Sequence, residues 1–430
     1  MKVLVIGGGG REHAIVWKLS QSELVDRIYC MPGNAGIAEI AECVDISPGD
    51  FSSILDFVKY EWIDLTVVGP EDPLARGIVD AFQKEGRKIV GPTQQAAQLE
   101  SSKVFAKEFM KRYGIPTASY RVFTSYLHAE DYIKLKGAPI VVKADGLAAG
   151  KGVFVCKSID EAIEAVRLIM KEQVFGKAGE RVVIEDYLEG EEASFMAFTD
   201  GKTIIPMVSS QDHKRVFDND EGPNTGGMGA YSPAPVVTPE IKRKVLSRIL
   251  NPLLKGLRSE GIEYRGIIYA GLMIKDNEPY VLEFNCRFGD PETQPVLMRL
   301  KSDLLKVFLS ITEQKLHEIR LQWRKDASVC VVLASKGYPG KYEKGKVITG
   351  LEMLKDRKDI MVFHAGTSFQ NGNIVTSGGR VMGVTSLGKD INDAVKRVYS
   401  AIELINFEGM HYRKDIAKRA IQRITSGVKI

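Results

Sequence analysis

The sequence predicts a multidomain protein of α/β and α+β type: a doubly wound N-terminal domain, a mixed central domain and a small strand-rich C-terminal domain. In the first hundred residues, short apolar runs alternate with amphipathic helical patterns, which is typical of parallel βαβ units. From about residue 103 strands dominate, and the last hundred residues contain mainly short strands separated by turns. We therefore expect domains at 1–102, 103–326 and 327–430.

Periodicity places the elements of each domain in order. In the N-terminal domain, strands are predicted at 2–7, 26–33, 63–70 and 88–92, and helices at 11–22, 51–62 and 74–86. In the central domain, strands are predicted at 138–146, 152–158, 181–188, 191–201, 202–213, 266–276 and 278–285, and helices at 102–114, 160–170 and 239–261. In the C-terminal domain, strands are predicted at 327–335, 345–351, 360–369 and 373–388, and a helix at 391–405.

Two stretches between these elements carry their own signals. The Gly- and Pro-rich stretch at 221–235 has no periodicity, and loops of that length inside a compact domain are usually functional or disordered. Asn371–Gly372 is a hairpin turn signal. We expect a functional or disordered loop at the first and a tight turn at the second.

The bulk composition indicates a soluble globular protein. Hydrophobic residues are 44% and charged residues 27% of the chain, and the net charge of +4 is dispersed, which argues against nucleic acid. The most basic stretch, "RKDIAKRAIQR", is expected to be a solvated helix face. Five scattered cysteines, without metal-ligand spacing, favour a reducing compartment. Without a signal peptide or an apolar run near 18 residues, we expect a cytoplasmic protein and no membrane contact.

The stretch "VIGGGGREH" runs from a strand through glycines into a helix, so backbone N–H groups and the helix N-terminus can face an anion. The dinucleotide fingerprint fails, because Glu12 stands where its third glycine belongs, and no acid ends the second strand. A small phosphate ester near Arg11 fits best. A tight turn without a ligand is the alternative.

The stretch "KADGLAAGKGV" looks like a phosphate-binding P-loop but lacks its spacing. Asp145 stands where the first glycine is required, and Gly152 stands where a hydroxyl should hold Mg²⁺. Two strands joined by a Gly-rich loop form a lid that can close over a triphosphate with its backbone N–H groups. Lys143 lies on the strand and is therefore held more firmly than Lys151. An ordinary surface hairpin is the alternative.

The stretch "VLEFNCRFGDPETQ" has the densest chemistry. On a strand, Glu283 and Asn285 share a face, and their oxygens suit Mg²⁺ bound with phosphates. Arg287 offers a fork for a carboxylate or phosphate, and Asp290 and Glu292 could hold an ammonium. The alternative is a polar strand edge. In "SSQDHKR", Asp212 and its charged neighbours are expected to place charge around a substrate.

In this order, the segments resemble the ATP-grasp superfamily and, within it, the phosphoribosylamine–glycine ligase family of purine biosynthesis. The motifs that carry the resemblance are "GGGGREHA", "PGNAG", "VGPEDPL", "KADGLAAGKGV", "SQDHKR", "GPNTGGMGAYSPAP", "EFNCRFGDPETQ", "GYPG", "FHAGT" and "GGRV". The resemblance implies a Rossmann-like N-terminal domain, an ATP-grasp core with a lid at about 120–188, and a small C-terminal domain. It also implies ATP-dependent ligation of glycine to 5-phosphoribosylamine through glycyl phosphate, with Mg²⁺ or Mn²⁺. Transient contact with other enzymes of that pathway is compatible with it.

The resemblance also implies the roles of single residues. Those implied to bind ATP are Lys103, Lys143, Gly146, Gly150, Lys151, Gly152, Glu185, Asp186, Tyr187, Leu188 and Glu192. Those implied to bind glycine are Asp212, Arg287, Asp290 and Glu292, and those implied to hold the metal are Glu283 and Asn285. Those implied to bind phosphoribosylamine are Gly8, Gly9, Gly10, Arg11, Glu12 and Asn34. Those implied to act in catalysis are Lys143, Asp212, Arg287 and Asp290.

Two departures from the family pattern are visible. Asp186 stands where the family usually has Glu, and the strand before Glu283 lacks a central acid, which leaves the number of metal ions open. Three alternative functions stay open as well. They are a related ligase with another substrate pair, a nicotinamide oxidoreductase and a non-catalytic nucleotide-binding regulator.

Overall fold

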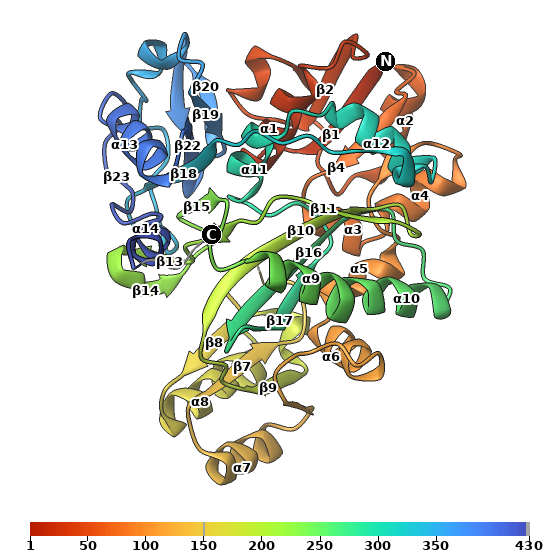
Figure 1. The fold of residues 1–430 in the computed structure, drawn as a ribbon, viewed down its shortest axis with the longest axis vertical. Coiled ribbons are helices and arrows are strands. Elements are labelled where there is room, and N and C mark those ends of the chain that lie inside the picture. Colours follow the sequence, from red (N-terminus) through yellow and green to blue (C-terminus); the bar gives the residue numbers. More distant parts are fainter. Residues whose placement is uncertain (149–150, 427–430) are drawn as a thin grey trace.

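The N-terminal sheet is parallel throughout, which confirms the predicted βαβ pattern. The structure, a computed structural model, describes residues 1–148 and 151–426 (Figure 1). The sheet has the order β3-β2-β1-β4-β5, with every neighbouring pair parallel. Its elements are β1 (Lys2–Gly7), β2 (Arg27–Pro32), β3 (Glu42–Cys43), β4 (Leu65–Val68), β5 (Ile89–Val90), α1 (Gly10–Leu19), α2 (Phe51–Tyr60), α3 (Glu71–Ala75) and α4 (Ile78–Lys84). The glycine loop leaves the sheet at the end of β1, where strand order reverses and ligands bind in such folds.

The central sheet is antiparallel, with the order β11-β10-β16-β17. Its strands are β10 (Glu191–Thr199), β11 (Ile204–Pro206), β16 (Gly266–Lys275) and β17 (Glu278–Asn285). The predicted helix at 239–261 is present as α9 (Pro239–Val245) and α10 (Asn251–Ser259), joined by a π-type turn at Leu246–Leu250. That turn precedes Pro252, which cannot donate a backbone hydrogen bond to the preceding turn.

A second antiparallel sheet, with the order β6-β9-β7-β8, forms a separate lobe at the bottom of Figure 1. Its elements are β6 (Tyr120–Phe123), β7 (Ile140–Ala144), β8 (Val153–Cys156), β9 (Val182–Asp186), α7 (Tyr126–Lys136) and α8 (Ile159–Val166). The lobe has an apolar core of its own, which includes Ile133, Val142 and Val166. Strand β6 and helix α7 were not predicted; α7 has only two fully buried residues and therefore little apolar periodicity.

The C-terminal sheet takes two strands from the central part of the chain. Its order is β12-β15-β18-β22-β19, and β23 also pairs with β18. Its strands are β12 (Gln211–Asp212), β15 (Gly229–Ser232), β18 (Ala327–Ser335), β19 (Ile360–His364), β22 (Arg380–Gly388) and β23 (Met410–His411). Gly229 pairs with Val331, so this sheet crosses the predicted limit at 326. The domain limits stay a prediction.

Two sequence predictions are wrong in this region. The stretch at 221–235 is not an unstructured loop, because it contains β14 (Glu221–Asn224) and β15. Their partners lie in other segments: β14 pairs with β13 (Arg215–Phe217) and β15 pairs with β18. The strand expected at 345–351 is present only as isolated bridges from Val347 and Thr349. The hairpin at Asn371–Gly372 is confirmed, with φ of 50° and 77° between β20 (Thr367–Gln370) and β21 (Asn373–Thr376).

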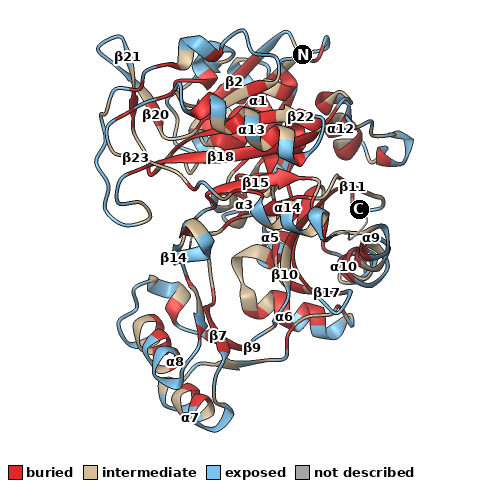
Figure 2. Cartoon of the chain, turned by 60° about the vertical axis from the view of Figure 1, so that its left-hand side comes forward, coloured by how far each residue is buried: buried red, intermediate tan, exposed pale blue. Residues whose placement is uncertain are grey.

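Six further helices follow the N-terminal sheet along the chain. They are α5 (Gln94–Ser101), α6 (Lys103–Arg112), α11 (Thr293–Arg299), α12 (Leu304–Thr312), α13 (Ile391–Ile402) and α14 (Lys418–Thr425). Helix α11 is buried along its whole length and packs against α1, β18 and β22, and Figure 2 shows the buried strands β18 and β22 near α1. No helix within the described ranges is both long and apolar enough to cross a membrane.

The basic stretch at 413–423 is not a solvated helix face, and this prediction is wrong. The Arg413 side chain is 1% exposed and forms ion pairs with Asp220 and Asp415. Arg419 pairs with Asp220, and Arg423 pairs with Glu191 at 2.7 Å. A basic sequence pattern does not reveal that distant acids cover it.

Candidate functional site

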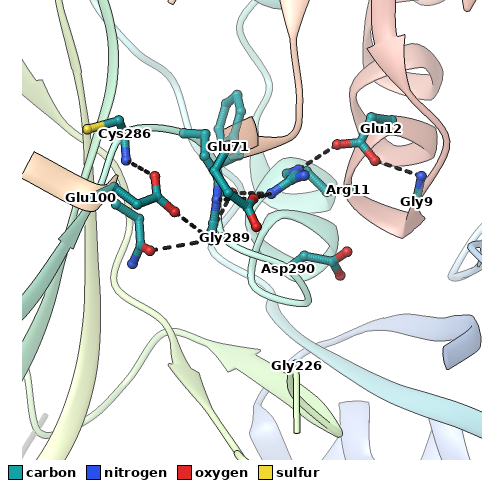
Figure 3. Close-up of polar contacts among 12 residues, drawn as sticks. Gly9, Arg11, Glu12, Glu71, Glu100, Gly226, Cys286, Gly289 and Asp290 are labelled. Carbon is teal, nitrogen blue, oxygen red and sulfur yellow. Dashed lines mark hydrogen bonds and ion pairs between the residues drawn. The ribbon is translucent and has the colours of Figure 1, made fainter. Parts of the chain in front are cut away.

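The glycine loop packs against the protein itself so closely that side chains are excluded. A Cβ at Gly8 would meet the Gly33 carbonyl oxygen at 2.4 Å, and one at Gly9 would meet Glu12 Oε2 at 2.8 Å. The Gly9 N–H donates to that Glu12 oxygen at 2.6 Å (Figure 3). Asn34, from the loop after β2, donates to the Gly8 carbonyl at 2.9 Å. The structure thus brings the predicted phosphoribosylamine residues of 8–12 and Asn34 together.

Arg11 and Glu12, at the start of α1, are buried and hold each other. Arg11 Nε lies 2.6 Å from Glu12 Oε1, and Arg11 Nη1 donates to the Phe288 carbonyl at 3.2 Å. Glu71, at the first position of α3, lies 3.9 Å from Arg11 Nη1. Figure 3 shows Arg11 between Glu12 and Glu71. Its bond to the Phe288 carbonyl also connects it to the segment after β17.

Arg287 is the centre of a charged network. Its Nε lies 3.1 Å from Glu71, and its Nη2 lies 2.9 Å from Glu100. Nη1 donates to the Phe288 carbonyl at 3.1 Å, and Nη2 also donates to Asn285 Oδ1 at 3.3 Å. Three of the five guanidinium N–H groups therefore donate hydrogen bonds to protein atoms, and Glu100 adds an ion pair to Nη2. The fork that was expected to face a substrate is therefore largely occupied by protein groups.

The two carboxylates of this network respond differently to burial. Burial opposes ionisation of Glu71, but Arg287 and Arg11 outweigh it and lower the pKa of Glu71 to about 2. For Glu100, burial dominates and raises the pKa, although Arg287 opposes the shift. Glu100 also accepts the Cys286 N–H at 2.6 Å. Arg287 is thus held from two sides by residues of the first hundred.

Asp290 and Glu292 follow β17 and face different neighbours. Asp290 lies 3.2 Å from Arg380 Nη2 and accepts from Gln294 at 2.9 Å. A Cβ at Gly9 would lie 3.5 Å from Asp290 Oδ2, so this carboxylate borders the glycine loop. Glu292 is buried and accepts from the Tyr269 hydroxyl at 2.8 Å.

Lys143 is fixed from two directions at the end of β7. Its ammonium lies 2.9 Å from Glu185 Oε1 and donates to the Leu282 carbonyl at 3.1 Å. The register of β16 and β17 shifts at this place, because Gly271 pairs with Glu283 and Leu272 with Val281, which leaves Leu282 as an extra residue. Such bulges redirect backbone and side chains next to active sites.

The predicted adenosine segment has one buried and one exposed end. The Glu185 carboxylate is 2% exposed and lies between Lys143 and Lys107, which is 2.8 Å away. Asp186 pairs with Lys136 at the surface, Tyr187 is exposed and Leu188 is half-buried. The Glu185 side chain is therefore used inside the protein.

The lid loop approaches its own strands and the C-terminal domain. A Cβ at Gly152 would meet Ala148 at 2.7 Å, and Lys103 donates to the Gly146 carbonyl at 2.9 Å. Lys151 is exposed and its ammonium lies 3.4 Å from the Pro339 carbonyl oxygen. Gly150, predicted to bind ATP, lies outside the described residues.

Asp212, Lys214, Glu192 and Glu283 form one charged group. Lys214 Nζ lies 2.8 Å from Glu192 Oε2. Desolvation raises the pKa of Asp212 to about 7. The Lys214 ammonium opposes this shift, and the carboxylates of Glu292 and Glu192 add to it. Desolvation disfavours the Lys214 ammonium, but Glu192, Asp212 and Glu283 raise its pKa well above the usual value.

Glu283 and Asn285 fit a hard cation that is shared with phosphates. Glu283 loses solvation, yet Lys214, Lys143 and Lys103 lower its pKa, so its carboxylate is ionised. Carboxylate and amide oxygens suit Mg²⁺, which usually takes few protein ligands beside substrate phosphates. Elsewhere in the described chain, no group of three or more His, Cys, Asp or Glu could hold a metal.

Four partners of these predicted residues were missed by the sequence analysis. They are Glu71, Lys107, Glu100 and Arg380. Glu71 lies in the motif "VGPEDPL" and Arg380 in "GGRV", so both motifs could have drawn attention to them. Lys107 and Glu100 lie on helices whose sequences have no distinguishing pattern.

Comparisons with known proteins place these features in one family. Family models described as Phosphoribosylglycinamide synthetase match in three parts: the N domain at 1–100, the ATP-grasp (A) domain at 101–293 and the C domain at 328–419. The chain is 53% identical over 427 residues to phosphoribosylamine–glycine ligase of Escherichia coli (strain K12), covering 98% of this chain and 99% of the relative. It is 52% identical over 426 residues to that of Vibrio vulnificus (strain CMCP6), with the same coverage.

Solved structures agree. The crystal structure of phosphoribosylamine–glycine ligase from Thermotoga maritima has a TM-score of 0.85 and 35% identity, covering 97% of this chain and 100% of that one. The biotin carboxylase domain of Hydrogenobacter thermophilus 2-oxoglutarate carboxylase, solved with MgADP and bicarbonate, has a TM-score of 0.72 at 18% identity, over 96% of this chain and 91% of that one. It therefore shares the fold. With all three domains matched and relatives above 50% identity over almost the whole chain, the protein belongs to the phosphoribosylamine–glycine ligase family.

Proposed function

We propose that the chain joins glycine to 5-phosphoribosylamine with ATP, and releases glycinamide ribonucleotide, ADP and phosphate. The observation that carries this function is the 53% identity to a phosphoribosylamine–glycine ligase across 98% of the chain. All five cysteines are free, which supports a reducing, cytoplasmic location. The partners are then small molecules.

ATP is proposed to bind between the lid and the central sheet. Lys103 and Lys143, with the lid loop at 146–152, face its phosphates, and the 185–188 segment presents backbone groups to adenine. Because the Glu185 carboxylate lies between two lysines, its role is to hold Lys143 in place. Glu192 accepts from the ribose hydroxyls and is held by Lys214.

A magnesium ion fits Glu283 and Asn285 best. When bound, it would add positive charge beside the phosphates, and Mn²⁺ would suit the same oxygen ligands. Lys143 and Arg287 supply fixed positive charge nearby. This charge matters because a glycine carboxylate must approach the γ-phosphate, and each pair of like unit charges at about 4 Å repels by about 4 kcal/mol at a dielectric near 20.

Glycine is proposed to lie among Arg287, Asp212, Asp290 and Glu292. Within the described residues, three of the five Arg287 N–H groups donate hydrogen bonds and Glu100 forms an ion pair with Nη2, so Arg287 offers the glycine carboxylate its positive charge and its remaining N–H capacity. The pKa of Asp212 near 7 means that an arriving ammonium would favour its ionised form. Glycyl phosphate then forms under the closed lid, which keeps water away from this reactive anhydride.

Phosphoribosylamine is proposed to bind at the glycine loop. Asp290 borders this loop and also belongs to the proposed glycine site, so the amine would reach the acyl carbon from that side. Arg11 is buried and paired with Glu12, and it contributes positive charge from within the fold. No side-chain nucleophile is needed.

The test is ADP release by the purified protein with ATP and Mg²⁺. We expect release only when glycine and phosphoribosylamine are both present, with glycinamide ribonucleotide detected by mass spectrometry. Bicarbonate or formate in place of glycine serves as the matched control. Release with either of them, and none with glycine, would replace this proposal by a related ligase.

A further inference from the structure

The segment 411–423 covers a two-stranded ribbon that leads away from the proposed site. The ribbon consists of β13 and β14, and it begins one residue after Lys214. In Figure 1, β13, β14 and α14 lie side by side near the C-terminus. Hydrogen bonds and ion pairs connect the two segments across about 200 residues of sequence, and Phe217 also packs edge-to-face on His411.

Arg413 is the centre of these contacts. Its side chain is 1% exposed, and Asp415 holds it bidentately, with Nε 2.7 Å and Nη2 2.8 Å from the two carboxylate oxygens. Nη1 then donates to the Arg215 carbonyl at 3.1 Å and to Asp220 Oδ1 at 3.0 Å. The buried Arg413 guanidinium therefore binds both the first strand of the ribbon, at Arg215, and its turn, at Asp220.

Other residues of the segment 411–423 also form hydrogen bonds with the ribbon and its turn. His411 Nε2 lies 2.9 Å from the Val216 carbonyl oxygen, and the Lys414 N–H donates to Asp218 at 2.8 Å. The Asn219 N–H donates to Asp415 at 2.9 Å. The turn needs such support, because Asn219 and Asp220 have φ of 58° and 57°, a conformation that costs side-chain-bearing residues energy.

The ribbon is continuous with the charged group of the site. The Lys214 carbonyl accepts from the Thr225 N–H at 2.8 Å, and the next carbonyl, that of Arg215, is the one that Arg413 holds. The Lys214 ammonium meets Glu192. A second connection reaches the same place, because Arg423 lies 2.7 Å from Glu191, the residue before Glu192.

We propose that the segment 411–423 is a strap that positions Lys214 and Glu192 for ATP, with Arg413 as its main positioning residue. The strap touches no substrate itself. It acts through backbone carbonyls and through Glu191, so its loss shifts the charges of the site by small distances, which is enough to weaken binding. The proposal rests on the ATP site described under the proposed function.

The test compares Arg413→Met with Arg397→Met in the full chain. Arg397 lies in the same domain and also pairs with two carboxylates, Asp393 and Asp359, but it does not contact the ribbon. We expect Arg413→Met to raise the KM for ATP about tenfold and leave the KM for phosphoribosylamine within about twofold. Arg413→Lys, which keeps the charge, should recover part of the loss. Arg397→Met should match the wild type.

A second variant keeps the test decisive if Arg413→Met does not fold. Arg423→Met removes a partly exposed pair and should raise the KM for ATP about threefold. Unchanged KM values for ATP in folded variants, or the same change in Arg397→Met, would overturn the strap. The affinity for Mg·ADP, measured by calorimetry, should fall in parallel. The affinity for Mg·ADP can be measured without glycine or phosphoribosylamine, so the strap can be tested even if the proposed ligase assay fails.

Discussion

Arg287 lies 2.9 Å from Glu100 and 3.1 Å from Glu71. This residue of the proposed glycine site, which follows β17, is therefore held by two carboxylates from the first hundred residues. The Arg287 side chain is 17% and the Glu100 side chain 8% exposed, so water screens this pair weakly. The network joins the N-terminal and central domains at the proposed glycine site. It has consequences for both stability and catalysis.

Arg287→Ala should destabilise the protein strongly, because it leaves the buried Glu100 without its cation and removes one of the two arginines beside Glu71. We expect a loss of about 3–5 kcal/mol in the free energy of unfolding, measured with urea. Adding Glu100→Gln removes one orphaned charge and keeps an acceptor for the Cys286 N–H. The double variant should therefore be more stable than Arg287→Ala alone. A less stable double variant would contradict this account.

Arg287→Lys separates the catalytic role from stability, because it keeps the charge. We expect the KM for glycine to rise steeply, by about tenfold or more, and the affinity for ATP to change little. Steady-state kinetics with each substrate varied in turn would show this. If the affinity for ATP falls instead, Arg287 belongs to the phosphate site.

Lys143→Ala should impair ATP use more than Lys151→Ala. Lys143 is fixed by Glu185 and the Leu282 carbonyl, whereas Lys151 is exposed on the loop. We expect kcat/KM for ATP to fall about a hundredfold for Lys143→Ala and about tenfold or less for Lys151→Ala. The two variants control for each other. A larger effect at Lys151 would show that the rigid strand position is not decisive.

Cys286→Ser should keep most of the activity despite the position of Cys286 beside Arg287. The thiol is buried, and burial raises its pKa far above the usual value, so it does not supply a thiolate. We expect turnover within about threefold of wild type. Loss of turnover with intact ATP binding would show that the Cys286 thiol is needed for the reaction.

Stability should fall as the pH drops below about 6.5. Burial lowers the pKa of His13 and of His213 to about 3 each, and that of His364 to about 4. The unfolded chain therefore binds protons that the folded chain excludes, and each such histidine removes up to about 1.4 kcal/mol per pH unit below 6.5. Unfolding midpoints between pH 7 and pH 5 would measure this.

His364→Gln should make that pH dependence shallower by about one proton. His317→Gln is the matched control for removing a histidine, because its side chain is 64% exposed. Equal slopes in wild type and His364→Gln would mean that this histidine is protonated without opposing folding.

The sequence alone predicts much of this protein, because the relevant signals are local. Apolar runs that alternate with helical patterns predict the parallel N-terminal sheet. The two-residue period of a strand predicts that the Glu283 and Asn285 side chains share one face. The motifs of the glycine loop, the lid and "EFNCRFGDPETQ" identify the family before any contact is known. Backbone preferences and short-range periodicity suffice for each of these.

The tertiary structure alone decides which charges meet. Arg287 is partnered by Glu71 and Glu100, Leu282 offers its carbonyl to Lys143, and Arg413 is buried beside Asp220. Each contact joins residues that are far apart in the chain, and each depends on how domains and strands pack. The strength of an ionic interaction depends on the distance between the charges and on the exclusion of water, and neither can be deduced from the local sequence.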